Sequence, residues 1–204
     1  MKCILKLSQQ EIIMKKIAIL ILLINLNIFA TTKASFGLNV NPNDLEIEGK
    51  TSIAFATSNL DFRNFYIDAN FINSEETLVG LGLFVENSPT NYENIAFYIG
   101  LRTIFTEHKL GSSFTAIPIM FGAKARMYLG SLPKSNLGLK FAYAPSPLTF
   151  QDAESYFEYR IEVDMSIIEN INVYLGYRSI DTNYKLLDAN YNDALYIGFK
   201  FVLE

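Results

Sequence analysis

The chain has 204 residues, of which 50% are hydrophobic and 19% are charged, and it contains 12 tyrosines, 16 phenylalanines and no tryptophan. One domain fits this length, and a single cysteine and a single histidine exclude a disulfide framework, a cysteine-based zinc site and a histidine-rich metal site. The formal net charge of −4 does not suit binding to nucleic acid, whose backbone requires a basic surface.

An apolar run near the N-terminus predicts a secretory signal peptide. The basic start Met14–Lys16 precedes residues 17–30, which are apolar except for two asparagines, and small residues follow. The run is shorter than the ~20 apolar residues that a membrane-spanning helix needs. We therefore expect residues 1–34 to be a signal peptide, with cleavage after Ala34 or, as the alternative, after Ala30.

The residues before the apolar run add nothing that a signal peptide needs, so we expect Met14 to be the true start. Cys3 precedes the apolar run, whereas a lipid-modified cysteine would follow it. Residues 1–34 carry five lysines and one glutamate, so the remaining chain has 12 basic and 20 acidic residues and no cysteine. A mature chain of this charge again indicates no nucleic-acid partner.

Apolar residues occupy every second position in ten later segments: 35–41, 45–55, 65–71, 79–86, 95–102, 117–127, 137–143, 156–165, 171–178 and 195–203. The clearest is 156–165, where Phe157, Tyr159, Ile161 and Val163 alternate with polar or charged residues. A period of two places each set on one face of a β-strand. Residues 35–204 therefore form a single all-β domain.

The two faces of these segments differ in a way that predicts a membrane barrel. The apolar faces carry no charge, whereas the other faces combine Gly, Asn and Tyr with balanced charges: Lys50, Arg102, Lys124, Arg126, Lys140, Arg160, Arg178, Lys200, Glu46, Glu48, Asp68, Glu86, Glu158, Glu162 and Asp164. A soluble sandwich or lipocalin-like barrel would carry a more densely charged outer face. We predict a closed antiparallel up-and-down transmembrane β-barrel of ten strands in the bacterial outer membrane. Eight strands are the alternative.

The connections between the segments predict the orientation. They alternate between short turns and a second set that includes the three longest, 106–113, 145–155 and 181–193. Short turns are periplasmic and long loops extracellular in such barrels, so we expect both termini in the periplasm. Pro118 lacks a backbone N–H, and we expect it at a bulge or at the rim.

Several stretches resemble the YfaZ family of outer-membrane proteins. They are Tyr143–Ser146, Phe150–Tyr156, Glu158–Arg160, Ile168–Asn170, Gly176–Arg178, Asp181–Tyr184 and the N-terminal stretch Ser35–Glu48. The resemblance covers residues 35–204 and is most specific over 141–184. It implies an exported small barrel and supplies no catalytic residues.

Four groups of residues have the composition of a chemical site. His108 with Glu107, Ser112 and Ser113 contains the residue types of a lipid-acting hydrolase. Glu158, Glu162 and Asp164 beside Arg160 could be paired acids or a calcium site, but i and i+2 carboxylates on one strand fit an interior ion-pair lattice better. Gly80–Gly82 lies inside a strand and is no phosphate loop. The acids of Asp152–Glu154 could bind a cation or a partner, but acidic residues in loops are commonly only solvated.

We expect no catalytic, cofactor-binding or metal-binding residue and no enzymatic activity. The leading hypothesis is a structural or surface-interaction barrel, the alternative is a narrow pore for small solutes, and the third is a lipid-acting enzyme centred on His108. The expected partners are outer-membrane lipid and, during insertion, the barrel-assembly machinery. We expect a monomer with a lumen filled by side chains.

Overall fold

The computed structural model describes residues 33–53, 65–74, 76–92, 94–107, 112–128, 130, 133–185 and 187–203. Their strands are β1 (Ala34–Val40), β2 (Leu45–Ile53), β3 (Phe65–Asn73), β4 (Thr77–Asn87), β5 (Ile95–Glu107), β6 (Ser113–Ala116), β7 (Ile119–Met127), β8 (Ser135–Ala144), β9 (Thr149–Gln151), β10 (Ala153–Ile168), β11 (Ile171–Tyr184) and β12 (Leu187–Leu203). A 3₁₀ turn, η1 (Ser146–Leu148), precedes β9. Among these residues, no helix has the length and hydropathy to cross a membrane.

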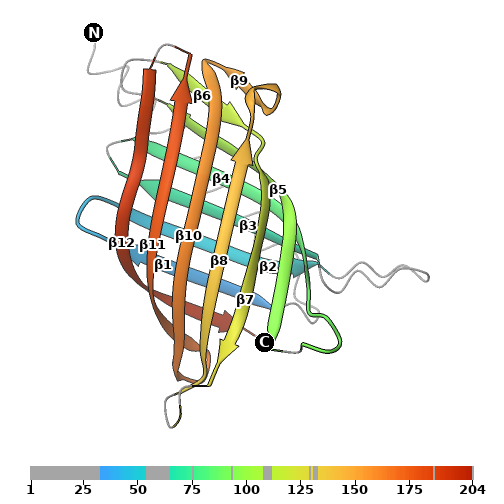
Figure 1. Cartoon of the computed structure of the whole chain (residues 1–204). Helices are drawn as coiled ribbons and strands as arrows, with labels where there is room; N and C mark the ends of the chain where they lie inside the picture. The colour runs from blue at the N-terminus through green and yellow to red at the C-terminus, as the bar shows by residue number, and fades with distance from the viewer. Residues whose placement is uncertain are drawn as a thin grey trace. The chain divides into compact units, whose positions relative to one another are not determined.

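Ten of the described strands close into an antiparallel barrel, as the period-two pattern predicts (Figure 1). Each strand pairs with the next in the order β1-β2-β3-β4-β5-β7-β8-β10-β11-β12, and β12 pairs with β1 from Ala34↔Leu203 to Val40↔Ile197. Closure leaves no open edge that could meet lipid with unpaired backbone groups. The expectation of ten strands rather than eight is confirmed.

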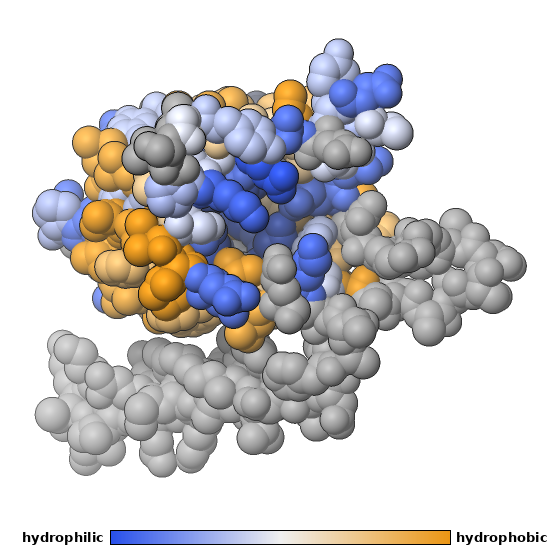
Figure 2. Space-filling model, turned by 90° about the horizontal axis from the view of Figure 1, so that it is seen from below, coloured by the Kyte–Doolittle hydropathy of each residue, from blue (hydrophilic) through white to orange (hydrophobic). Residues whose placement is uncertain are grey.

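The apolar sets point outward, which confirms the assignment of the two faces. In β4, buried and exposed residues alternate along most of the strand. Leu81 and Leu83 are about half exposed, whereas Gly80 and Gly82, which precede them, are buried. Ile99 and Leu195 are 62% and 66% exposed. Figure 2 shows apolar residues around the barrel and hydrophilic residues in its hollow centre. Outward apolar residues on a closed barrel are solvated by lipid, so the protein is an outer-membrane barrel.

Inward aromatic residues pack over glycines on the neighbouring strand. Four cross-strand pairs have this form: Phe84↔Gly100, Tyr98↔Gly122, Tyr174↔Gly198 and Tyr196↔Gly176. In each pair, a Cβ added to the glycine would collide with the aromatic side chain. The glycines on the polar face therefore make room for rings inside a narrow barrel.

The barrel has two ends, which we call the terminal end, where β1 begins and β12 finishes, and the distal end. β10, β11 and β12 have 16, 14 and 17 residues, although about 9–11 residues suffice for a strand to span a membrane. At the distal end, Asp181 on β11 pairs with Phe157 and Asn190 in the backbone ladder. These strands therefore extend beyond the membrane at the distal end.

The predicted contrast between short and long connections is wrong. Within the segment 181–193, expected to be a loop, β11 continues to Tyr184 and β12 begins at Leu187, and the two strands pair as far as Tyr184↔Leu187. The other two long connections are partly ordered as strands, because β6 pairs with both β5 and β9. Pro118 lies in the break between β6 and β7, where its carbonyl oxygen still accepts from Arg102 N at 3.0 Å.

Candidate functional site

The distal end of the lumen is filled by inward apolar side chains. Buried residues from seven strands meet there: Ile72, Leu78, Ile104, Phe114, Ala116, Ala142, Ala144, Ala153, Tyr156, Ile180 and Tyr184. The Phe114 ring centroid lies 6.1 Å from that of Tyr156 and 5.3 Å from that of Tyr184. We call this set the distal plug. Its dense packing excludes water from this end of the barrel.

The middle of the lumen is crossed by charged side chains that converge on Glu46 of β2. Both carboxylate oxygens of Glu46 accept from Arg160, at 2.9 and 2.8 Å, and Arg178 donates to the same carboxylate. Asn39 and Asn70 donate to it at 2.8 and 3.0 Å. Glu46 is fully buried, so these four partners replace the water that the carboxylate would otherwise bind.

The Glu46 network continues through the side chains around it. Arg178 also donates to Asp44 at 2.8 Å, and Asp44 in turn accepts from Asn192. Glu158, which is buried, accepts from Tyr156 of the distal plug at 2.7 Å. These contacts join β2, β10, β11 and β12 across the lumen, so the plug and the charged layer form one continuous obstruction.

A second charged group lies around Asp68 of β3. Arg102 donates to Asp68 through Nη2, and Lys140 Nζ lies 3.7 Å from the same carboxylate oxygen. Arg102 is 2% exposed, yet its Nε and Nη1 have no hydrogen-bond acceptor among the described residues. Nη1 lies 3.7 Å from a carboxylate oxygen of Glu158, which is beyond hydrogen-bond distance. Two nitrogens of the Arg102 guanidinium are therefore left without a hydrogen bond in this group.

A chamber of about 400 Å³ occupies the lumen between these charged layers and the terminal end. Glu46, Arg160, Asp68, Arg102 and Lys140 line its inner end, where the charged layers close it. Phe84 and Met120, which belong to the same buried apolar cluster as the distal plug, also line the chamber, whereas the residues of the plug itself do not. Viewed from the terminal end, the chamber is the hydrophilic hollow of Figure 2.

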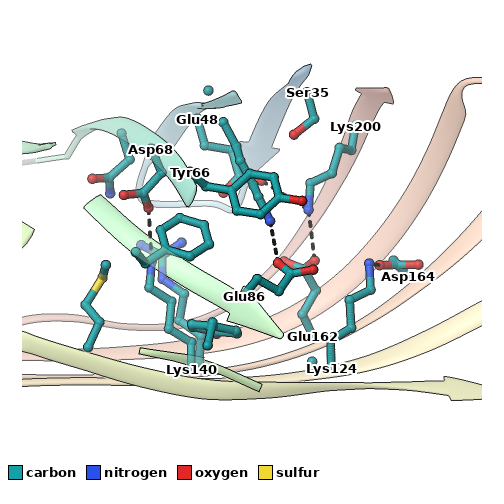
Figure 3. A pocket seen from close by; sticks show the side chains of 18 of the residues that line it. Ser35, Glu48, Tyr66, Asp68, Glu86, Lys124, Lys140, Glu162, Asp164 and Lys200 are labelled. Carbon is teal, nitrogen blue, oxygen red and sulfur yellow. Dashed lines mark hydrogen bonds and ion pairs between the residues drawn. The ribbon is translucent and has the colours of Figure 1, made fainter. Parts of the chain in front are cut away.

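The wall of the chamber near the terminal end carries paired charges (Figure 3). Lys50 donates to Glu86 at 2.7 Å, and Lys200 donates to Glu162 at 3.1 Å. Lys124 Nζ lies 2.9 Å from a carboxylate oxygen of Asp164. The Lys50 ammonium also lies 4.1 Å from the Tyr66 ring centroid and 4.8 Å from that of Phe84, which are cation–π distances. These lysines are already satisfied by protein groups.

The predicted lattice on β10 lies inside the lumen, but it serves three separate groups. Glu158 joins the Glu46 network, Glu162 pairs with Lys200, and Asp164 pairs with Lys124 and accepts from Asn136 at 2.5 Å. Among the described residues, no group of three or more His, Cys, Asp or Glu side chains has the arrangement of a metal site.

The residues of the hydrolase hypothesis are not brought together in the part of the chain that the structure describes. His108 lies outside it. Ser113 begins β6, and its backbone N–H donates to the Asp152 carboxylate at 3.1 Å. Lys185 donates to Gln151 O at 2.7 Å, so the Asp152–Glu154 region is held to the neighbouring distal connections. Gly80 and Gly82 face Asn70 and Asp68 inside the barrel, which agrees with a position within a strand.

Sequence reasoning did not predict the distal plug or the Glu46 network. Ile72, Leu78, Ile104 and Ile180 continue the inward parity of their strands, but they lie just beyond the polar positions used to define that face. Their positions, two residues from a residue of the inward face, were the signal that could have predicted them. The partners of Glu46 lie up to 132 residues away in the chain, and local spacing carries no signal for such pairings.

Comparison with known proteins identifies one family, and the distantly similar solved structures include two outer-membrane proteins. The family described as YfaZ precursor matches residues 14–203. The NanC porin structure in a rhombohedral crystal form is 12% identical, with a TM-score of 0.46, and the match covers 85% of this chain and 100% of that one. The outer membrane channel DcaP of Acinetobacter baumannii is 7% identical, with a TM-score of 0.39, and the match covers 84% and 62%. No curated protein matches. At these values neither structural likeness assigns a function.

Proposed function

Because this chain belongs to the YfaZ family, we propose that it is a non-enzymatic, non-conducting outer-membrane barrel with a structural or surface-interaction role. The observation that carries the proposal is the obstruction of the lumen by the distal plug and the Glu46 network. A channel needs a continuous path of water, and both layers consist of side chains that are buried and packed or hydrogen-bonded. The barrel would then contribute its outer wall and its distal surface.

The distal surface supports the interaction role. β10, β11 and β12 extend beyond the span that lipid requires, and β6 and β9 add a small sheet beside them. Two hydrogen bonds hold this region together: Lys185 donates to the backbone carbonyl of Gln151, and the Ser113 N–H donates to the Asp152 carboxylate. A fixed projection needs little ordering when a partner binds, which lowers the entropic cost of the complex. We propose that this projection faces the outside of the cell and that the chain is a monomer inserted by the barrel-assembly machinery.

The alternative of a narrow pore is supported by the chamber itself, because it already opens part of the lumen at the terminal end. Planar-bilayer recording on purified protein separates the two functions. We expect no reproducible conductance steps, with a known porin in the same membrane as the positive control. Reproducible, ion-selective steps would replace the proposal with the pore. Release of fatty acid from phospholipid vesicles, abolished in a Ser113→Ala variant, would instead support an enzyme.

A further inference from the structure

We propose that the inner end of the chamber binds a small oxyanion, a carboxylate or phosphate group, that enters from the terminal end. The proposal goes beyond the structural role, because it assigns a ligand site to a lumen that need not conduct. It rests on Arg102 and Lys140, which both line the chamber, and on their unpaired donors. Figure 3 shows Lys140 and Asp68 among the side chains around the chamber.

Arg102 and Lys140 differ from Lys50, Arg160 and Lys200, three other cations that line the chamber. Lys50 and Lys200 donate to carboxylates at 2.7 and 3.1 Å, and Arg160 makes two hydrogen bonds to Glu46. Lys140 Nζ, in contrast, is 3.7 Å from Asp68, which is beyond hydrogen-bond distance. The structure gives Lys140 no hydrogen bond within the residues that it describes.

Arg102 has the same deficit in a more buried place. Its guanidinium has five N–H groups, and Asp68 is its one hydrogen-bond partner among the described side chains. A buried, charged N–H group that has no acceptor costs free energy, because it has lost its hydrogen bonds to water. Arg102 and Lys140 approach the same Asp68 oxygen, and both residues line the inner end of the chamber.

The chemistry of this surface selects the class of ligand. Two cations with free N–H groups can satisfy a group that only accepts hydrogen bonds, and carboxylates and phosphates are such groups. Asp68 Oδ1 and Asn70 Oδ1 lie against Gly82 and Gly80 of β4 and accept no hydrogen bond from either cation. The chamber volume of about 400 Å³ accommodates a small molecule.

Fluorine NMR on the folded barrel in a neutral detergent tests the site, with trifluoroacetate as the probe. We expect its signal to broaden and shift saturably, and trifluoroethylammonium, a cation of similar size, to remain unaffected. Inorganic phosphate that displaces the probe identifies a general oxyanion site, whereas phosphate without effect identifies a carboxylate site. No saturable change with trifluoroacetate, or an equal response to the cation, overturns the proposal and leaves water as the partner of the donors.

Two lysines of the chamber provide matched variants. Lys140→Gln should weaken trifluoroacetate binding by about tenfold, because it removes a free cationic donor. Lys124→Gln should change it by less than about threefold, because Lys124 is exposed and already lies 2.9 Å from Asp164. Lys140→Arg should keep binding, and heat-modifiable gel migration checks that each variant folds. Equal losses in the two glutamine variants would mean that the probe senses only the overall charge, and the site would be rejected.

Discussion

Replacing Glu46 by glutamine should destabilise the barrel more than any other single exchange of a carboxylate for an amide in the lumen. The carboxylate receives five hydrogen bonds from four side chains, two of which are guanidinium groups. Glu46→Gln removes the negative charge and turns one acceptor into a donor that faces buried cations. Breaking a buried ion pair by removing one partner costs about 3–5 kcal/mol, and we expect a loss of this size.

Glu48 is the matched control, because it lies two residues further along β2 on the same inward face. Its side chain is 26% exposed, and it contacts Lys200 at 3.3 Å. An ion pair that water reaches is worth less than about 1 kcal/mol, so Glu48→Gln should be nearly neutral. The free energy of unfolding is measured for both variants by urea titration in lipid vesicles, with tyrosine fluorescence and gel migration as the signals.

Two results would refute this reasoning. If Glu46→Gln unfolds within about 1 kcal/mol of the wild type, water or a rearranged network reaches the hub, and the lumen is not obstructed there. If Glu48→Gln costs as much as Glu46→Gln, burial does not decide the energy of these pairs. Either result would also weaken the case against a pore.

Three further predictions concern the wall and the N-terminus. Ile161→Arg should destabilise the barrel in vesicles by about 2–4 kcal/mol, because Ile161 faces lipid near the middle of the bilayer. Ile168→Arg, at the end of β10, should cost about 0–1 kcal/mol. Similar losses for the two variants in urea titration would contradict these depths. Gly122→Ala should impair folding, because its Cβ would collide with a tyrosine ring and a backbone carbonyl, whereas Gly138→Ala, with its nearest neighbour at 3.8 Å, should migrate like wild type in the gel assay. The mature chain should begin at Ser35, which removes one residue from the start of β1; an intact mass that retains Met1 would contradict export.

The strands and their faces could be predicted from the sequence because lipid imposes a strict local rule. In β10, the apolar side chain of Ile161 faces lipid and the charged side chain of the next residue, Glu162, faces the lumen, so the alternation can be recognised from adjacent residues. The segment 181–193 breaks this rule. Where a strand leaves the membrane, water meets its outer face, and polar residues such as Asp181 and Asp193 are acceptable there. The pattern then looks like a loop although the backbone ladder continues.

The arrangement inside the lumen could be predicted only in part. Inward charge at Arg160 and Glu158 follows from parity, and both are buried in the lumen. Which acid meets which base depends on how far each strand is shifted when the barrel closes, and no local spacing records that shift. The free donors of Arg102 and Lys140 follow from the same cause, because they depend on distances between strands that are distant in sequence.

The hub at Glu46 also sets an order of events during biogenesis. Glu46 belongs to the second strand, whereas its arginine partners follow 114 and 132 residues later in the chain. A chain that has delivered only its first strands to the membrane therefore carries an unneutralised carboxylate on the face that must become the interior, and lipid disfavours such a group. Insertion of these first strands should be reversible until β10 and β11 arrive. A truncated chain would remain outside the bilayer, within reach of periplasmic proteases, instead of persisting as a defective barrel.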